Sequence, residues 1–185
     1  MKTSQNTRAA CRRLGAIMLA VCLGLWAGVA AAPAASAVGG PVLVCTGSVS
    51  QSYSPGLLLV PRQTTYHGTV SYSTCPVNDG AVTSGLYAES LTYTASCTAN
   101  GGPSEADVAW NNGQHSHLAV TGVEADVAGN VQIFTSIGQV TSGRYVGHVV
   151  NIVTVLPNLA TLAACLLPPG LTHNQGTATL TVAGL

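Results

Sequence analysis

Charged side chains are scarce in this sequence, and lysine is missing from most of it. The 185 residues include six Lys plus Arg and six Asp plus Glu, and after residue 37 the only basic residues are Arg62 and Arg144. All six acids follow residue 37, so residues 38–185 carry two basic against six acidic groups, a net charge of −4 with histidines neutral. An acidic segment without lysine argues against nucleic acid or an anionic membrane as a partner. Disorder is not indicated, because Val, Leu, Ile, Thr and Tyr are plentiful.

The motifs that mark common enzyme classes are also missing. There is no G-x-S-x-G, no recognisable order of Ser, His and acid, no carboxylate pair typical of a glycosidase and no Gly-rich phosphate loop. The histidines His67, His148 and His173 are scattered along the chain. We therefore predict a protein that is not an enzyme, with no catalytic residue, no cofactor and no metal site.

Residues 1–37 are predicted to be an export signal and not part of the fold. The apolar run Leu14–Ala32 is followed by Ala35-Ser36-Ala37, a small-x-small cleavage site. Four basic side chains precede the run: Lys2, Arg8, Arg12 and Arg13. Cleavage would leave residues 38–185 as a single domain of a secreted, extracellular protein with no membrane contact.

Three alternatives to a cleaved export signal were considered. The apolar run is long enough to span a bilayer, so it could act as an uncleaved anchor. Cys22 could mark a lipoprotein site, but Val21 is a poor residue before it and the apolar stretch continues. Arg12-Arg13 could belong to a twin-arginine signal, but Gly15-Ala16 stands where that motif carries a bulkier apolar residue. Ordinary secretion remains the preferred interpretation.

The rest of the chain indicates an all-β protein, because no segment shows sustained helical periodicity. Turns are predicted at Ser54-Pro55-Gly56 and Asn78-Asp79-Gly80, and a turn or two of helix within Leu159–Leu167. About eight antiparallel strands predict an immunoglobulin-like β-sandwich, with a small barrel as the alternative. Besides a central hairpin, the strand-like runs are Pro41–Ser50, Gln63–Tyr72, Leu86–Cys97, Val131–Val140, Arg144–Leu156 and Gly176–Ala183.

The central hairpin spans residues 105–120 and contains Trp110, the only Trp after residue 37. A three-residue loop, Asn111-Asn112-Gly113 with Gly113 left-handed, places Trp110 opposite Gln114. This register separates an apolar face (Ala106, Val108, Trp110, Leu118 and Val120) from a polar one (Glu105, Asp107, His115 and His117). A two-residue loop would mix the faces, so we predict the three-residue loop.

The polar face of the hairpin holds the strongest metal-ligand pattern in the chain. His115 and His117 are two apart on one strand and point the same way, and Asp107 is predicted to lie across from His117. Two imidazoles and a carboxylate could bind Zn²⁺ or Cu²⁺. A solvated face with one His–Asp pair is the preferred interpretation.

Four cysteines follow the predicted signal, and in an exported chain they predict two disulfides. No pair has C-x-x-C spacing, which argues against zinc. If strands alternate in direction, Cys45 and Cys75 lie at one end of the fold and Cys97 and Cys165 at the other. We therefore predict the bonds Cys45–Cys75 and Cys97–Cys165.

Several short pieces of the chain form a pattern that can be compared with known families: Cys45-Thr46-Gly47, Ser54-Pro55-Gly56-Leu57, Ser96-Cys97, Trp110-Asn111-Asn112-Gly113, Val140-Thr141-Ser142-Gly143-Arg144-Tyr145-Val146-Gly147 and Cys165. This pattern resembles that of a group of small secreted actinobacterial proteins with an immunoglobulin-like β-fold and no established activity. The resemblance implies export and that fold, but no reaction. Composition also gives a weaker similarity to secreted enediyne-carrying apoproteins.

These observations predict a non-catalytic extracellular module that binds a protein, a glycan or a neutral small molecule. The alternatives are a small-molecule carrier with an apolar cleft between sheets and, less favoured, a hydrolase or metal enzyme. Six tyrosines could line a ligand surface, although ordinary strand positions explain them as well. Because loops at one end of such folds carry recognition, the predicted binding residues are Asn111, Asn112, Gly113, His115, His117 and Asp107.

Overall fold

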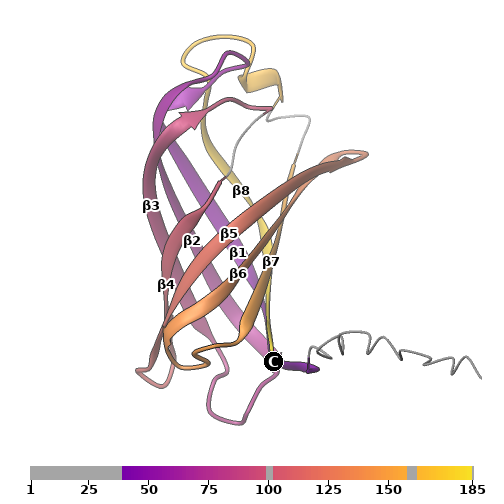
Figure 1. Cartoon of the computed structure of the whole chain (residues 1–185). Helices are drawn as coiled ribbons and strands as arrows, with labels where there is room; N and C mark the ends of the chain where they lie inside the picture. Colours follow the sequence, from indigo (N-terminus) through magenta and orange to yellow (C-terminus); the bar gives the residue numbers. More distant parts are fainter. Residues whose placement is uncertain (1–38, 99–101, 158–161, 185) are drawn as a thin grey trace, which may run out of the picture. The chain divides into compact units, whose positions relative to one another are not determined.

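A computed structural model describes residues 39–98, 102–157 and 162–184, and the predicted export signal lies outside this range. The described residues form eight strands that pair with their sequence neighbours, and β8 pairs with β1 to close a barrel (Figure 1). Every pairing is antiparallel. The strands are β1 (Pro41–Leu57), β2 (Arg62–Val77), β3 (Gly85–Ala95), β4 (Ser104–Trp110), β5 (His115–Ala128), β6 (Val131–Gly143), β7 (Val149–Pro157) and β8 (Leu171–Ala183).

The prediction of an immunoglobulin-like β-sandwich is wrong, and with it the fold that the resemblance implied. An alternating strand with one wet face fits either architecture, and the ladder between β1 and β8 distinguishes them. That ladder runs from Pro41↔Ala183 to Leu57↔Leu171 and leaves no open edge between the first and last strands. The number of strands and the all-β class were predicted correctly.

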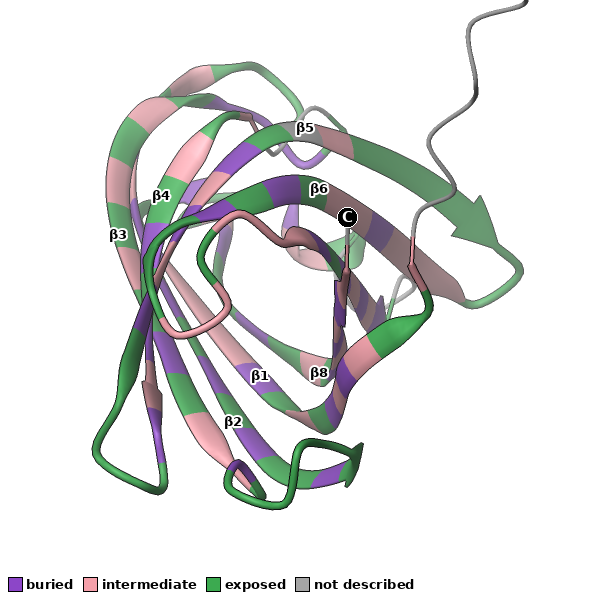
Figure 2. Ribbon diagram, turned by 60° about the horizontal axis from the view of Figure 1, so that its bottom comes forward, coloured by how far each residue is buried: buried purple, intermediate pink, exposed green. Residues whose placement is uncertain are grey.

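The alternation of apolar and polar residues that predicted the strands corresponds to side chains that point alternately into the lumen and out to solvent. In β2 the buried positions are the even-numbered ones from Thr64 to Tyr72, while His67, Thr69 and Ser71 face outward (Figure 2). Successive strand side chains point to opposite faces, and in a small barrel the inward set fills the interior. Gly47 stands at an irregular register between β1 and β2, where a Cβ would overlap the backbone of Ser71. Glycine is therefore needed there for the close approach.

Several predicted boundaries differ from the structure. Ser54-Pro55-Gly56 is not a turn, because β1 continues through it to Leu57. The predicted strand Arg144–Leu156 begins only at Val149, since residues 144–148 form turns that include Tyr145 at φ 64°. The Asn78-Asp79-Gly80 turn is present, with Gly80 at φ 84°. Only Leu162–Ala164 is helical in the described part of the predicted Leu159–Leu167 segment, whose residues 159–161 lie outside it.

Both predicted disulfides are confirmed, and each joins the ends expected from strand direction. Cys45–Cys75 links β1 to β2 and Cys97–Cys165 links the end of β3 to the β7–β8 connection. We call the end of the barrel that carries the first bond the lower end and the other the upper end, as drawn in Figure 1. Two disulfides indicate that the chain matures in an oxidising compartment.

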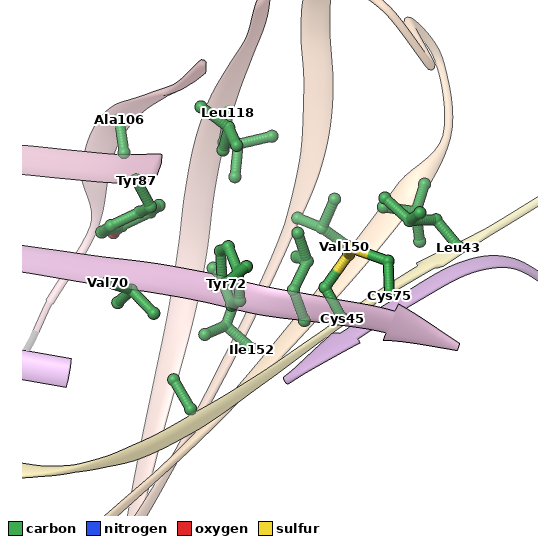
Figure 3. Close-up of a cluster of buried hydrophobic side chains, with 14 of the residues drawn as sticks. Leu43, Cys45, Val70, Tyr72, Cys75, Tyr87, Ala106, Leu118, Val150 and Ile152 are labelled. Atoms are coloured by element: carbon green, nitrogen blue, oxygen red, sulfur yellow. A yellow bond between two sulfur atoms is a disulfide. The ribbon is translucent and has the colours of Figure 1, made fainter. Parts of the chain in front are cut away.

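The core consists of two clusters stacked along the barrel axis. The larger one surrounds the Cys45–Cys75 bond and includes Tyr72, Leu118 and Val150 (Figure 3). The smaller cluster lies around the Cys97–Cys165 bond and includes Leu57 and Leu171. A sequence period of two thus fills both ends of the lumen with apolar side chains.

Candidate functional site

The central hairpin adopts the predicted register. Val108 pairs with Ser116. The backbone N–H of Trp110 donates a hydrogen bond to the backbone carbonyl oxygen of Gln114 at 2.8 Å, which closes the three-residue loop. Gly113 has φ 80°, the left-handed conformation that the loop requires. The sequence therefore predicted both faces of this hairpin correctly.

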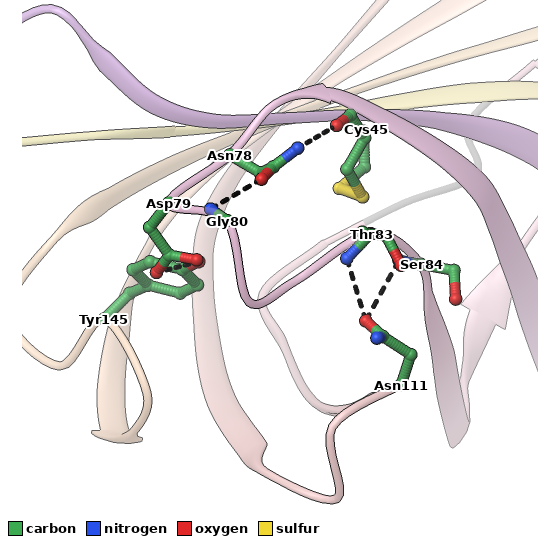
Figure 4. The surroundings of a disulfide bond; sticks show 9 residues. Cys45, Asn78, Asp79, Gly80, Thr83, Ser84, Asn111 and Tyr145 are labelled. Atoms are coloured by element: carbon green, nitrogen blue, oxygen red, sulfur yellow. Dashed lines mark hydrogen bonds between the residues drawn. A yellow bond between two sulfur atoms is a disulfide. The ribbon is translucent and has the colours of Figure 1, made fainter.

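The two asparagines of the loop shape turns at the lower end. The Asn111 side-chain oxygen accepts hydrogen bonds from the backbone N–H of Thr83 at 2.8 Å and of Ser84 at 3.1 Å (Figure 4). Asn112 accepts one from the Gln114 N–H at 3.0 Å. The Asn111–Gly113 tip is exposed. Its role in binding stays a prediction.

The predicted polar face lies on the outside of the barrel. His117 and Asp107 are paired across β4 and β5, as predicted, with Nδ1 and Oδ1 2.8 Å apart. Glu105 lies 3.8 Å from Nε2 of the same ring, and His115 is exposed on β5. The hydrogen bond with Asp107 raises the pKa of His117. Among the described residues, no three His, Cys, Asp or Glu side chains are grouped to hold a metal ion.

A polar network covers the lower end of the lumen and was not predicted. The Trp110 indole N–H donates to Ser116 Oγ at 2.8 Å, and that hydroxyl donates to the Arg144 carbonyl oxygen at 2.6 Å. The Arg144 guanidinium pairs with Asp79, which also accepts a bond from the Tyr145 hydroxyl at 3.1 Å. The lower end is therefore held by fixed contacts between side chains.

A cavity of about 80 Å³ lies in the lumen between the two core clusters. Since roughly 10–15 Å³ of such space holds one water, it has room for several waters or a compact organic group. Seven of the eight strands, β1 to β7, contribute side chains to its wall. Its polar lining is concentrated on β1, β2 and β3: Gln51, Tyr53, Tyr66, Tyr87, Glu89 and Tyr93.

The cavity lies where the barrel wall parts between β3 and β4. Their ladder runs from Gly85↔Trp110 to Ala88↔Asp107 and stops there, although β4 extends to Ser104 and β3 to Ala95. Beyond Ala88, the β4-facing edge of β3 has no paired strand among the described residues. Ser104 and Glu89 both line the cavity at this place. In the described part of the chain, the cavity therefore lies beside a stretch of the barrel wall where β3 and β4 are not paired.

A chain of hydrogen bonds fixes the aromatic wall of the cavity. The Tyr53 hydroxyl donates to Gln51 Oε1 at 3.0 Å, and Gln51 Nε2 donates to the Tyr66 hydroxyl at 3.2 Å. The rings of Tyr53 and Tyr66 have centroids 5.5 Å apart, and Tyr66 meets Tyr93 edge to face at 6.4 Å. One amide therefore sets the orientation of two rings, and the third ring packs against them.

Among the described residues, Glu89 is the only acidic one in the cavity wall. Its Oε2 is buried and has no hydrogen-bond partner among the described residues. Burial, and next the charge of Glu89, raise the pKa of Tyr66 and Tyr87. Across the β2–β3 ladder Glu89 faces Gly68, where a Cβ would overlap the Tyr66 hydroxyl. Glycine therefore leaves room for the ring and the carboxylate side by side.

Neither arginine of the barrel neutralises this carboxylate. Arg62 donates to the backbone oxygens of Gly56 and Pro169, and the Arg144 side chain is paired with Asp79. The sequence holds no further Lys or Arg after residue 37. Among the described residues, the Glu89 carboxylate thus has no arginine side chain as an ion-pair partner.

The sequence analysis missed the lumen site, although a signal for it was present. Tyr87, Glu89, Leu91, Tyr93 and Ala95 alternate along β3 and all face inward. An acid within an inward apolar series is unusual, because buried carboxylates are costly. In the sequence, Glu89 contributes only to the count of six acids, and ordinary strand positions account for the tyrosines.

Comparison of the chain with protein-family models, curated proteins and solved structures finds no match. Among the described residues, no helix has the length and apolar character needed to cross a membrane. The conclusions below therefore rest on the geometry of the barrel.

Proposed function

We propose that this protein is a secreted, non-catalytic carrier that binds a small molecule inside the barrel. The observation that supports it most directly is the cavity itself, which is lined by fixed tyrosines and lies beside the unpaired stretch of β3 and β4. Small-molecule sites are concave, mostly apolar, and carry a few placed polar groups, as this one does. The hydrogen bonds through Gln51 hold the wall in place before a ligand arrives, which reduces the ordering cost of binding.

Two features support the extracellular location. The first 37 residues have the charge pattern, apolar run and small-x-small site of an export signal. The two disulfides fit an oxidising environment. This proposal places binding in the lumen and keeps the exposed Asn111–Gly113 loop as a support of the lower end.

A thermal-shift screen of small organic molecules tests the carrier proposal. A ligand at 100 times its Kd stabilises the folded state by about 2.7 kcal/mol, which is a rise of several degrees in Tm for a chain of this size. Ser136→Phe fills the cavity from β6 and is expected to abolish the shift. Ser90→Phe puts the same side chain on the exposed face of β3 and should leave the shift unchanged. Equal shifts in both variants would place binding elsewhere.

A further inference from the structure

The ligand class follows from the charge of the lumen, and this inference rests on the carrier function proposed above. Glu89 places a carboxylate in a wall that is otherwise neutral. The hydroxyls of Tyr66 and Tyr87 interact with this carboxylate, but they bring no positive charge, and its Oε2 is buried without a hydrogen-bond partner among the described residues. A buried polar atom left unpaired is costly, and a buried charge more so. A ligand that brings a positive donor would remove this cost, while a neutral ligand would leave the charge uncompensated.

The surroundings of Glu89 favour an organic cation. Ring faces attract cations, and the tilted and edge-to-face contacts among Tyr53, Tyr66 and Tyr93 line one side of the cavity with aromatic surface. Phe134 adds a further ring on β6. A ligand with an ammonium group and a small apolar body would place its charge at Glu89 and its body against these rings.

The donor set argues against a bare metal ion. Calcium takes six to eight oxygen ligands and magnesium needs near-octahedral oxygen coordination. Among the described residues, the cavity wall offers a single carboxylate, and its other side-chain oxygens are neutral hydroxyls and the Gln51 amide, set among apolar side chains such as Val49 and Ile152. Apolar walls leave a metal ion without ligands, whereas they suit the hydrocarbon part of an amine.

The position of Glu89 makes it accessible to such a ligand. It is the first residue of β3 beyond the last pair with β4, Ala88↔Asp107, so it lies where the two strands are no longer paired. The residue as a whole is partly exposed although Oε2 is buried. Part of the Glu89 side chain is therefore in contact with solvent and can be reached by a cation.

We propose that Glu89 makes the lumen a site for small primary ammonium ions that carry a short apolar or aromatic group. The ammonium donates hydrogen bonds to the carboxylate, and the substituent packs against Tyr66 and Tyr93. The compact cavity, about 80 Å³, limits the substituent to a few carbon atoms or one ring. This replaces the neutral small molecule expected from net charge alone.

Calorimetric titration of the purified protein with benzylammonium and with benzyl alcohol tests the proposal. The two probes share a ring and a methylene and differ in charge. We expect benzylammonium to bind at least about tenfold more tightly, the effect of a charge-assisted hydrogen bond. Glu89→Gln should remove this preference and keep the binding of benzyl alcohol. Glu105→Gln makes the same change on the exposed outer face of β4 and should keep the preference.

The outcomes separate this inference from the carrier function. Equal affinities in the unmodified protein, or a preference that survives Glu89→Gln, would overturn the assignment of the cation to Glu89 while the carrier function stands. A preference lost equally in Glu105→Gln would show a general charge effect and would also overturn it. If neither probe binds, or if Ser136→Phe does not weaken binding, both proposals are wrong. The comparison of the two probes in the unmodified protein needs no variant to fold.

Discussion

Gly68→Ala should destabilise the barrel and disturb the lumen site in one step. Gly68 faces inward on β2, and a Cβ there would overlap the hydroxyl and ring of Tyr66. Only 8% of the Tyr66 surface is exposed, and its ring packs on Tyr53 and Tyr93. The ring therefore cannot move freely. The added methyl must displace the ring and break its hydrogen bond with Gln51.

The expected cost follows from overpacking. Extra carbon in a packed core costs about 1–3 kcal/mol, a range that includes the roughly 1 kcal/mol of a lost hydrogen bond. For a chain of this size each kcal/mol lowers Tm by about 2–4 °C, so the fall should lie at about 2–12 °C. Differential scanning calorimetry gives Tm, and titration with benzyl alcohol should show weaker binding in the same variant.

Gly40→Ala is the matched control. No atom lies within 4 Å of a Cβ built at Gly40, and its φ is not positive. The substitution should therefore leave Tm unchanged or raise it, since alanine lowers the entropy of the unfolded chain by about 0.4–1 kcal/mol. An unchanged or higher Tm in Gly68→Ala, with Gly40→Ala behaving alike, would refute the steric account of this wall.

Three further predictions concern the disulfides, a histidine and the lower end. Removing the Cys97–Cys165 bond by double serine substitution should lower the free energy of unfolding by about 4 kcal/mol in the chain-entropy account. Urea denaturation measures this free energy, and a loss below about 1 kcal/mol would contradict the prediction. Because its pKa is raised above 6.5, His117 stabilises the fold fully below that pH and loses this effect as the pH rises through the folded-state pKa. Asp107→Asn should lower the pKa measured by NMR, while the charge of Glu105 still raises it; an unchanged pKa would exclude the pair with Asp107 as the main cause. Ser116→Ala leaves the buried indole N–H unpaired and should cost about 1–3 kcal/mol in the same urea assay; a neutral result would mean that the indole finds another acceptor.

The features predicted correctly from the sequence depend on neighbouring residues or on strand direction alone. The loop Asn111-Asn112-Gly113 fixes its own register, because a slip by one residue would expose Trp110. The disulfide pairing follows from counting strands, which does not depend on whether they form one closed sheet or two open ones. The hairpin register and the disulfide pairing were therefore predicted correctly although the predicted sandwich was wrong.

Neither the closure of the barrel nor the lumen site could be predicted from neighbouring residues or from strand direction. Closure is a pairing of β1 with β8 across almost the whole domain, and period-two alternation has no signal for the distant partner. The site combines Gln51, Tyr66 and Glu89 from three strands, so its residues form no motif along the chain. The sequence shows only that Glu89 alternates in step with Tyr87, Leu91 and Tyr93, and the meaning of this pattern depends on knowing which face of the strand is inside.

The ladder between β1 and β8 also sets the order of events during synthesis. Cys45 pairs with Leu180, so the first strand stays without one of its two neighbours until the last strand is made. Contacts between such distant residues form slowly, because the loop between them must be closed first. A nascent chain can form its hairpins early, but it cannot close the ring or complete the lumen while it is still being extended. For a protein exported as proposed, this delay leaves the barrel unclosed while the chain crosses the membrane through a translocation channel. The barrel then closes outside, after β8 has crossed.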